Sequence, residues 1–307
     1  MKIISDASIR VSGCLTPSNA LKWVRESFSL KSSSRLPHKT SIPFGEGCFM
    51  NTMPCMVPDL GVFGVKVVTR YPNRMPSIAG DLLLYSESDG NLLALMDATQ
   101  LTAIRTGAVA ALAVETFARR DFSEVGIMGL GATGRATLSC LVELFGQRKL
   151  TVHLLDYKEQ ATETRIWLEE LGVAWKVDII SGARTLVRHS DVLISCITVA
   201  NNLIAEDADY RAGCLVVPVH TRGFQNCDLF FDRVFADDTD HVSGFRYFER
   251  FKSFAEFPDV LGGRVPGREN NQERILSYNI GIALHDVVFA YHIYRFFDSL
   301  MAPIIPC

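Results

Sequence analysis

A glycine motif between two short apolar runs constrains the fold of this chain most strongly. Residues 125–128 form an apolar run of the length expected for a buried parallel strand. The run leads into residues 129–134, GLGATG, which fit G-x-G-x-x-G, and an amphipathic segment follows. A second apolar run, residues 150–155, ends in Asp156, about twenty residues beyond the last glycine. This order of strand, glycines, helix, strand and acid predicts a dinucleotide-binding unit.

Each residue type in the motif has its own physical reason. Gly129 allows a tight turn, Gly131 lets the backbone approach a pyrophosphate, and Gly134 permits close packing of helix and strand. The free N–H groups and dipole of the helix start favour the anionic pyrophosphate. Asp156 is expected to bind a ribose 2′-hydroxyl and repel a 2′-phosphate, which favours NAD(H), although Lys158 softens that preference. The alternative is a glycine turn without a ligand. The predicted cofactor-binding residues here are Gly129, Gly131, Ala132, Thr133, Gly134 and Asp156.

Composition narrows the class of protein. The 307 residues suffice for one large or two ordinary domains, and 48% hydrophobic with 21% charged residues is typical of a soluble globular protein. A net charge of −3 gives no basis for nucleic-acid or membrane binding. The chain shows neither a transmembrane run nor the apolar core of a signal peptide. Its eight scattered cysteines, without a C-x-x-C pair, predict reduced thiols in a cytoplasm rather than disulfides or zinc.

Hydrophobic patterns predict an α/β fold with two parts. Strand and helix patterns alternate from residue 125 to 237, which predicts a doubly wound parallel sheet with ligands at its carboxyl edge. Residues 47–97 are predicted to be mostly antiparallel strands, with Asp89-Gly90 as a hairpin turn. Asp97 is the predicted cap of a helix over residues 98–118, whose small side chains should let it lie against the nucleotide domain. An irregular polar stretch is predicted beyond Gly262-Gly263 and Pro266-Gly267-Arg268, followed by a helix over residues 280–297.

The segment LMDATQLTAIRTGA, residues 95–108, resembles the ornithine cyclodeaminase/μ-crystallin family, which has a D-A-T-x-L-T-x-x-R-T segment before its dinucleotide-binding domain. Met53-Pro54, Gly64-Val65-Lys66 and residues 277–281 fall where that family has further motifs, so the resemblance spans essentially the whole chain. It implies a homodimer with a substrate-binding and dimerisation domain, residues 1–116 with 280–307, and a dinucleotide-binding domain, residues 117–279. The nicotinamide would face the substrate domain, and the implied further cofactor-binding residues are Thr106, Thr198 and Gly281.

The resemblance also implies that Lys66 and Arg105 clamp the α-carboxylate of a substrate. Their chemistry agrees, because a guanidinium binds a carboxylate through two hydrogen bonds and an ammonium adds a point charge. Lys66 lies in an apolar strand, VFGVKVV, where an unpaired ammonium is costly. The alternative is a lysine on a solvated strand face and an arginine in a surface ion pair.

The chain departs from the ornithine cyclodeaminases at the predicted pocket. Asn51 occupies the position of a glutamate, Arg222 that of an aspartate, Lys39 that of an arginine, and Thr133 that of a glutamine in the glycine loop. Asn51 and Arg222 are therefore predicted to contact substrate in a more positive pocket. Such a pocket would repel the side-chain ammonium of ornithine and suit an anionic substrate, for example a dicarboxylic amino, imino or keto acid.

Other polar residues have two open interpretations each. Arg222 is either in the pocket or paired with Asp228 or Asp232. His220 follows a predicted strand, as do Ile197-Thr198-Val199, and is either a general acid or base or a satisfied histidine beside the cofactor.

Two further polar groups are predicted to be structural. His285-Asp286 begins the last helix, and residues 237–241, DDTDH, are predicted to be a solvated turn rather than a metal site.

The leading hypothesis is an NAD(H)-dependent oxidoreductase of a small carboxylate-bearing amino, imino or keto acid. Lys66 and Arg105 would orient the substrate, and Lys66 or His220 would move the proton. The alternatives are an ornithine cyclodeaminase, which forms proline and ammonia with catalytic NAD, and a non-catalytic nucleotide-binding protein like the crystallin branch.

Overall fold

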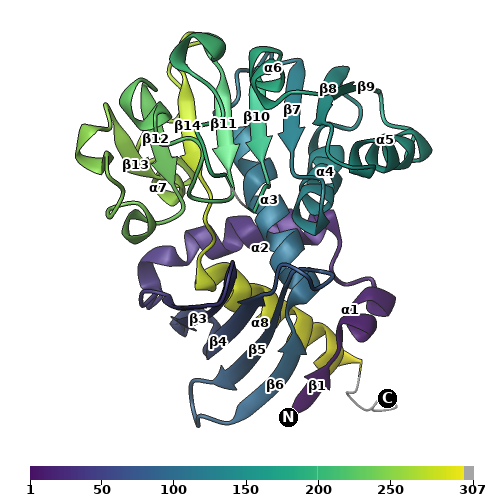
Figure 1. The fold of residues 1–307 in the computed structure, drawn as a ribbon. Coiled ribbons are helices and arrows are strands. Elements are labelled where there is room, and N and C mark those ends of the chain that lie inside the picture. Colours follow the sequence, from purple (N-terminus) through teal and green to yellow (C-terminus); the bar gives the residue numbers. More distant parts are fainter. Residues whose placement is uncertain (199, 301–307) are drawn as a thin grey trace. The chain divides into compact units, whose positions relative to one another are not determined.

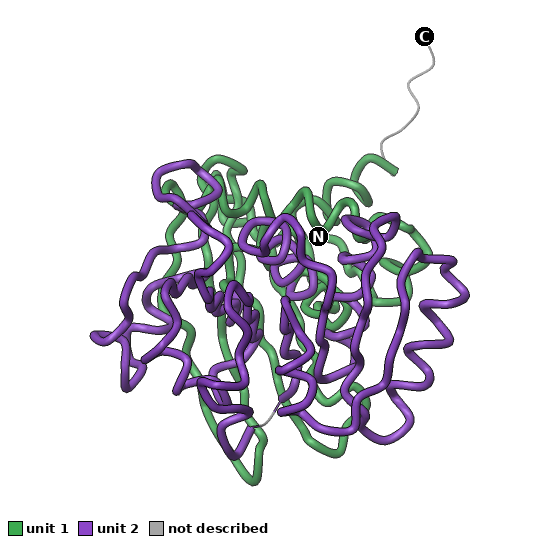
Figure 2. Tube along the Cα trace, turned by 90° about the horizontal axis from the view of Figure 1, so that it is seen from above, with its two compact units in different colours: residues 1–105, 282–307 green, residues 106–281 purple. Residues whose placement is uncertain are grey.

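The computed structural model describes residues 1–198 and 200–300 (Figure 1). The chain divides into two compact units, which Figure 2 colours separately: unit 1 is Met1–Arg105 with Ile282–Cys307, and unit 2 is Thr106–Gly281. The first boundary therefore lies within helix α3, Thr99–Phe117, and not after residue 116 as the sequence predicted. The reason is close packing inside unit 2, where a Cβ on Gly107 would lie 2.5 Å from the backbone nitrogen of Thr137.

Unit 1 contains a six-stranded sheet in the order β1-β6-β5-β4-β3-β2 (Figure 1). Strands β2 to β6 pair antiparallel, as predicted, and β1 is parallel to β6. Asp89 and Gly90 lie in the β5–β6 connection, where Gly90 has a φ of 70°. The strands are β1 Lys2–Ile4, β2 Thr40–Phe44, β3 Cys48–Val57, β4 Val62–Arg70, β5 Ile78–Ser86 and β6 Leu92–Asp97.

Besides the start of α3, the described part of unit 1 contains α1, α2 and α8, and α8, Ala283–Ser299, packs across β3, β4 and β5 (Figure 1). Helix α2, Pro17–Ser29, packs against α8 and begins as its sequence predicts, because Thr16 caps it by accepting from the N–H of Asn19. Helix α1 is Asp6–Ser12. Side chains alternate along the strands, so one face of the sheet lies under α8.

Unit 2 contains an eight-stranded, wholly parallel sheet in the order β13-β12-β14-β11-β10-β7-β8-β9. The predicted doubly wound fold is confirmed. The strand order reverses between β7 and β10, and ligands of such sheets bind at the carboxyl edge beside this reversal. The strands are β7 Glu124–Met128, β8 Leu150–Leu155, β9 Trp175–Ile180, β10 Val192–Ser195, β11 Leu215–Pro218, β12 Arg233–Ala236, β13 Phe254–Glu256 and β14 Ile275–Tyr278.

The prediction of an irregular polar stretch between Arg268 and the last helix is wrong at its end. Strand β14 lies there, between β11 and β12, and all four of its residues are buried. A four-residue run that is buried on both faces has no alternation to reveal it. The helices of unit 2, besides the end of α3, are α4 Ala132–Phe145, α5 Gln160–Glu170, α6 Ala183–Arg188 and α7 Phe257–Leu261.

Helix α3 begins at Thr99, one residue beyond the predicted start, and Asp97 Oδ1 accepts from the N–H of Thr99 at 2.8 Å. None of the helices within residues 1–198 and 200–300 has the length and apolarity needed to cross a bilayer.

Candidate functional site

The glycine loop of unit 2 lies at the strand-order reversal. Gly129 has a φ of 84°, and a Cβ there would lie 2.5 Å from the carbonyl carbon of Cys196, just beyond β10. A Cβ on Gly134 would collide with the carbonyl oxygen of Gly129. A Cβ on Gly131 would meet no described atom within 4 Å. Gly129 and Gly134 are thus required by packing, whereas the space beside Gly131 is open.

The start of helix α4 and the end of β8 flank this space with groups suited to a dinucleotide. Gly131 is the N-cap of α4, and no described side chain caps the helix, so its first N–H groups are not satisfied by a cap. Asp156 directly follows β8 with its side chain exposed. Lys158, two residues on, has its ammonium over the ring of Tyr157, 5.2 Å from the centroid.

The other predicted cofactor residues are distributed over unit 2. Thr106 lies on α3 and is half-buried, and Thr198 follows β10 and is exposed, while the predicted Val199 falls outside the described residues. Gly281 has a φ of 95°, and its N–H donates to Asp237 Oδ2. Asp237 is fully buried, which corrects the prediction that residues 237–241 form a solvated turn.

His220 follows β11, and burial favours the neutral form of its ring. Burial lowers the pKa of His220 from 6.5 to about 4, while a hydrogen bond to the backbone of Arg222 opposes that shift. Its Nε2 also lies within hydrogen-bonding distance of the Ser195 hydroxyl, at 2.6 Å. These contacts favour the interpretation of His220 as a satisfied histidine over that of an acid or base.

The side chain of Arg222 is exposed, and it forms no ion pair with any described residue. Its two proposed structural partners are engaged elsewhere. Asp228 accepts from the Tyr278 hydroxyl at 2.8 Å, and Asp232 pairs with Lys252 at 3.0 Å. The suggestion that Arg222 pairs with either carboxylate is therefore wrong.

Unit 1 holds a buried cluster of three charged side chains. One oxygen of Asp286, Oδ1, lies 2.7 Å from Lys66 Nζ and 3.1 Å from Arg105 Nε. Lys66 and Asp286 have no solvent exposure, and Arg105 is 5% exposed. The structure thus contradicts a solvated Lys66 and a surface ion pair for Arg105, and it also shows that Asp286 does more than begin a helix.

Strand alternation explains why the three charges meet. Lys66 is on the face of β4 that carries the buried Gly64 and Val68, which is the face covered by α8. Asp286 lies in the first turn of α8, and Arg105 lies on α3. The sequence signal for Asp286 was the lysine in an apolar strand, because a buried ammonium needs a carboxylate partner.

The surroundings of Lys66 set its protonation. Burial, followed by the charge of Arg105, lowers the pKa of Lys66 from 10.5 to about 7, and Asp286 opposes both. Burial would raise the pKa of Asp286, but Arg105 and Lys66 together hold it below its usual value. The cluster therefore contains a permanent carboxylate and a lysine that exchanges its proton near neutrality.

Asn51 and Lys39 extend the cluster within unit 1. Asn51 pairs with Val68 in the β3–β4 ladder, which makes it a diagonal neighbour of Lys66 on the same sheet face. Its Oδ1 is buried without a hydrogen-bond partner among the described residues. Lys39 is near enough for its charge to lower the pKa of Lys66. The structure therefore brings Asn51, Lys66 and Arg105 together in unit 1, with Lys39 beside them.

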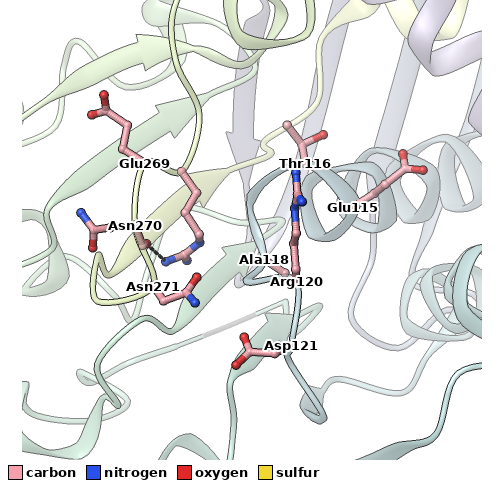
Figure 3. A pocket seen from close by; sticks show the side chains of 9 residues that line it. Glu115, Thr116, Ala118, Arg120, Asp121, Glu269, Asn270 and Asn271 are labelled. Carbon is pink, nitrogen blue, oxygen red and sulfur yellow. Dashed lines mark hydrogen bonds between the residues drawn. The ribbon is translucent and has the colours of Figure 1, made fainter.

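Unit 2 has a cavity of about 630 Å³, whose lining side chains are drawn in Figure 3. Its lining comes from the segment that precedes β7 and from the segment that precedes β14, which are the amino ends of those strands. The labelled side chains in Figure 3 include Glu115, Arg120, Asp121, Glu269 and Asn270. Acidic and basic groups alternate there, and no predicted site residue belongs to it.

Metal-binding clusters and disulfides are absent from the part of the chain that the structure describes. No group of three or more His, Cys, Asp or Glu there could hold a metal ion. The seven described cysteines are all free, and Cys307 lies outside the described residues.

The order of these motifs and the fold agree with one known family. The profile of the ornithine cyclodeaminase/mu-crystallin family matches residues 4–299. The chain belongs to this family.

Individual relatives are distant in sequence but match over most of their length. The chain is 25% identical to nodulation efficiency protein NfeD of Rhizobium meliloti, covering 86% of this chain and 85% of that protein. It is 24% identical to alanine dehydrogenase of Archaeoglobus fulgidus, covering 93% and 92%. The structure of Thermococcus litoralis Δ(1)-pyrroline-2-carboxylate reductase, in complex with NADH and L-proline, has a TM-score of 0.85 at 23% identity and 98% coverage of both chains. That likeness supports the fold.

Proposed function

We propose that this protein is an NAD(H)-dependent oxidoreductase of a small carboxylate-bearing amino, imino or keto acid. The observation that carries the proposal is the charge of the cluster in unit 1, where Lys66 and Arg105 share the single carboxylate of Asp286. With Lys66 protonated, this buried group has one excess positive charge. One substrate carboxylate would make it neutral, which is the arrangement that buried charges require.

The donors left free by Asp286 suit a carboxylate. Arg105 uses Nε toward Asp286, so its Nη1 and Nη2 form a fork that can bind two carboxylate oxygens. The contact with Asp286, 2.7 Å from Nζ to Oδ1, occupies at most one of the three N–H donors of the Lys66 ammonium. Lys66 therefore retains N–H donors for a ligand. Two cations from different elements would fix both the position and the orientation of the α-carbon.

The glycine loop of unit 2 fits a dinucleotide. Gly131 leaves open space, and the uncapped start of α4 would bind the pyrophosphate. Asp156 would accept from the ribose hydroxyl and select NAD(H) against NADP(H). When bound, this cofactor accepts or supplies the hydride. Two similar proteins support this proposal. One is named an alanine dehydrogenase, and the other is a Δ(1)-pyrroline-2-carboxylate reductase whose structure contains NADH.

Lys66 is the proposed proton donor and acceptor. Its pKa of about 7 lets it hold or release a proton at neutral pH, whereas His220, with a pKa of about 4, stays neutral. Lys66 would donate a proton during reduction and accept it during oxidation of the amine.

The substrate class we favour is an acid with a second negative charge. Within unit 1, the charge of Lys39 acts on Lys66 as that of a third cation, and Asn51 removes the negative charge that the cyclodeaminases have there. A neutral Asn51 Oδ1, buried without a partner, would accept an N–H of the substrate. These charges disfavour ornithine and support a dicarboxylic amino, imino or keto acid.

We further propose a homodimer formed through the sheet of unit 1. The face opposite α8 carries Phe63, Val65, Leu83 and Tyr85, all only half-buried, and the rings of Phe63 and Tyr85 stack at 5.0 Å. An apolar sheet face of this kind is typical of a subunit interface. A Val65→Asp variant that sediments as a monomer would support this interface. Free cysteines support a reducing compartment, for which we propose the cytoplasm.

A substrate panel tests the proposed activity. Purified protein is incubated with NADH and with oxaloacetate, 2-oxoglutarate or pyruvate plus ammonia, and with Δ1-pyrroline-2-carboxylate, while absorbance at the NADH band is followed. We expect turnover with at least one dicarboxylic acid and none after Arg105→Met. Ammonia release from ornithine with catalytic NAD⁺ would favour the cyclodeaminase alternative. Tight NADH binding without turnover on any compound would favour the crystallin-like alternative.

A further inference from the structure

Among the described residues, Asp286 is the one carboxylate that contacts both cations of the cluster, and its geometry indicates more than charge balance. Its Oδ1 contacts Lys66 Nζ at 2.7 Å and Arg105 Nε at 3.1 Å, so both cations converge on a single atom. Two cations held so near to each other repel strongly in a buried site, because solvent does not screen them there. Without the shared oxygen, the flexible lysine stem would let the ammonium move away from the guanidinium.

The position of Asp286 is itself rigid. It lies in the first turn of α8, which packs against three strands of the sheet, and its side chain is fully buried. His285, the preceding residue, is anchored by a 2.6 Å hydrogen bond between its Nδ1 and the Ser27 hydroxyl, and its ring packs edge-on against Phe28. The carboxylate therefore points from a fixed helix start toward Lys66 and Arg105.

We propose that Asp286 is a positioning residue, which holds Lys66 and Arg105 at the spacing that receives the substrate carboxylate and keeps Lys66 protonated until substrate binds. The catalytic part of this inference rests on the proposed function, because it assumes that the cluster binds a substrate carboxylate. The charged and titratable groups around the lysine are Arg105 from α3, Lys39 from the segment before β2, and Asp286 from α8, with Cys55 and His285 close to the carboxylate.

The direction of the effect on protonation follows from the signs of these charges. Arg105 and Lys39 both lower the pKa of Lys66, and Asp286 raises it toward about 7. Removing the charge of Asp286 leaves only burial and the two cations, so the pKa of Lys66 must fall. At neutral pH the lysine would then be mostly neutral and would bind a carboxylate weakly.

A titration of Lys66 in the unliganded protein tests the proposal without any substrate. Protein labelled with [ε-¹³C]lysine is titrated by NMR, and the Lys66 signal is identified by its loss in Lys66→Met. We expect the Asp286→Asn variant to titrate at least about one pH unit below wild type, as for the loss of an opposite charge at this distance. The Asp298→Asn variant is the control, because it removes an exposed carboxylate from the same helix.

A second pair of variants keeps the test decisive if Asp286→Asn does not fold. Arg105→Met is compared with the double variant Arg105→Met/Asp286→Asn, which removes one charge of each sign and so avoids an excess of buried cations. The Lys66 midpoint should be lower by at least about one pH unit in the double variant than in Arg105→Met. Equal midpoints in this pair would overturn the proposal.

The same shift in the titration of Lys66 should appear in the pH dependence of kcat/KM, for any substrate that the protein is found to reduce. The alkaline limb of kcat/KM for NADH-dependent reduction should move to lower pH in Asp286→Asn by the amount that NMR measures. An unmoved limb would overturn the positioning role. A shifted NMR midpoint in a protein that turns over no substrate would instead contradict the proposed function and leave the Asp286–Lys66 coupling established.

Discussion

The candidate site of unit 1 consists of buried charged side chains, whereas that of unit 2 consists of backbone exposed by glycine. In unit 1, Lys66 and Arg105 are brought to Asp286 by three different elements. In unit 2, Gly131 leaves an open approach to the start of α4, and the nearby histidine is neutral. One site therefore titrates near neutral pH and the other does not. We expect changes in unit 1 to affect substrate use and pH dependence, and changes in unit 2 to affect cofactor affinity.

The largest expected effects are those at the proposed carboxylate clamp, where Lys66→Met affects both activity and stability. This substitution removes one of two cations from the proposed carboxylate clamp, so kcat/KM should fall on the order of 10²- to 10³-fold, as for one partner of a buried charged pair. Thermal stability at pH 6 should nevertheless stay equal or rise, because Asp286 keeps Arg105 as its single partner. The measurements are steady-state kinetics and thermal unfolding at several pH values.

The pH dependence of that stability has a definite sign. Lys66 has a pKa of about 7 when folded and 10.5 as its ordinary value, so between these pH values the unfolded chain binds a proton that the folded chain lacks. Its contribution to wild-type stability therefore rises with pH across this window. The advantage of Lys66→Met should be greatest below pH 7 and shrink above it. Lys22→Met, an exposed change in the same unit, is the control, and a matching loss of activity there would contradict the comparison.

Gly131→Ala should give the next largest effect, on the cofactor alone. A Cβ at this position meets no described atom, so the fold should tolerate it, but it would stand where the pyrophosphate approaches. We expect the Kd for NADH to rise about tenfold or more, which is about 1.4 kcal/mol, with unfolding temperature unchanged. Gly134→Ala should instead destabilise the protein, because its Cβ would collide with Gly129.

Gly244→Ala provides the matched control for cofactor binding. Its Cβ would also meet no described atom within 4 Å, and it lies outside the glycine loop. Equal NADH affinity in Gly131→Ala and wild type would show that the backbone in unit 2 is not the pyrophosphate site.

The same contrast explains which features could be predicted from the sequence. The dinucleotide site is built from residues that are close in sequence, with glycines at recognisable spacing, and β8 matches its predicted bounds. The cluster of unit 1 joins residues separated by up to 220 positions in the chain, between Lys66 and Asp286. Only the family resemblance singled out Lys66 and Arg105, and Asp286 was interpreted as structural.

The missed strand β14 has a similar cause. It pairs with β11 and β12, so its neighbours come from positions far earlier in the chain. Its four buried residues follow a polar stretch and lack both alternation and turn signals. The sequence therefore predicted elements that have their own local pattern, such as β8. It did not predict β14, which depends on pairing with strands that are distant in the chain.

Asp156→Asn in unit 2 should have a smaller effect, which is on the choice between NADH and NADPH. Asp156 is exposed at the end of β8, where its charge would repel a 2′-phosphate. We expect the ratio of kcat/KM for NADPH to that for NADH to rise by about three- to tenfold, as for a partly screened charge. Glu159→Gln makes the same change of net charge three residues away and should leave the ratio near that of wild type. An equal rise in both variants would indicate general electrostatics instead of a ribose contact.

His220→Gln should have the smallest effect and bears directly on where the proton is exchanged. If Lys66 in unit 1 exchanges it, the limb of kcat/KM near pH 7 should stay in place, with at most about a two- to threefold loss of rate from the altered contact to Ser195.

The stability of His220→Gln at acidic pH should differ from that of the wild type, although its activity should change little. The folded pKa of His220 is about 4 against 6.5 ordinarily, so between these values the unfolded chain binds an extra proton and wild-type stability falls as the pH falls. His220→Gln removes that part of the acid loss. His189→Gln, an exposed histidine in unit 2, serves as the control in both measurements. A shift of the limb near pH 7 in His220→Gln alone would move the acid–base role to unit 2, because no change confined to a neutral histidine could move the titration of Lys66.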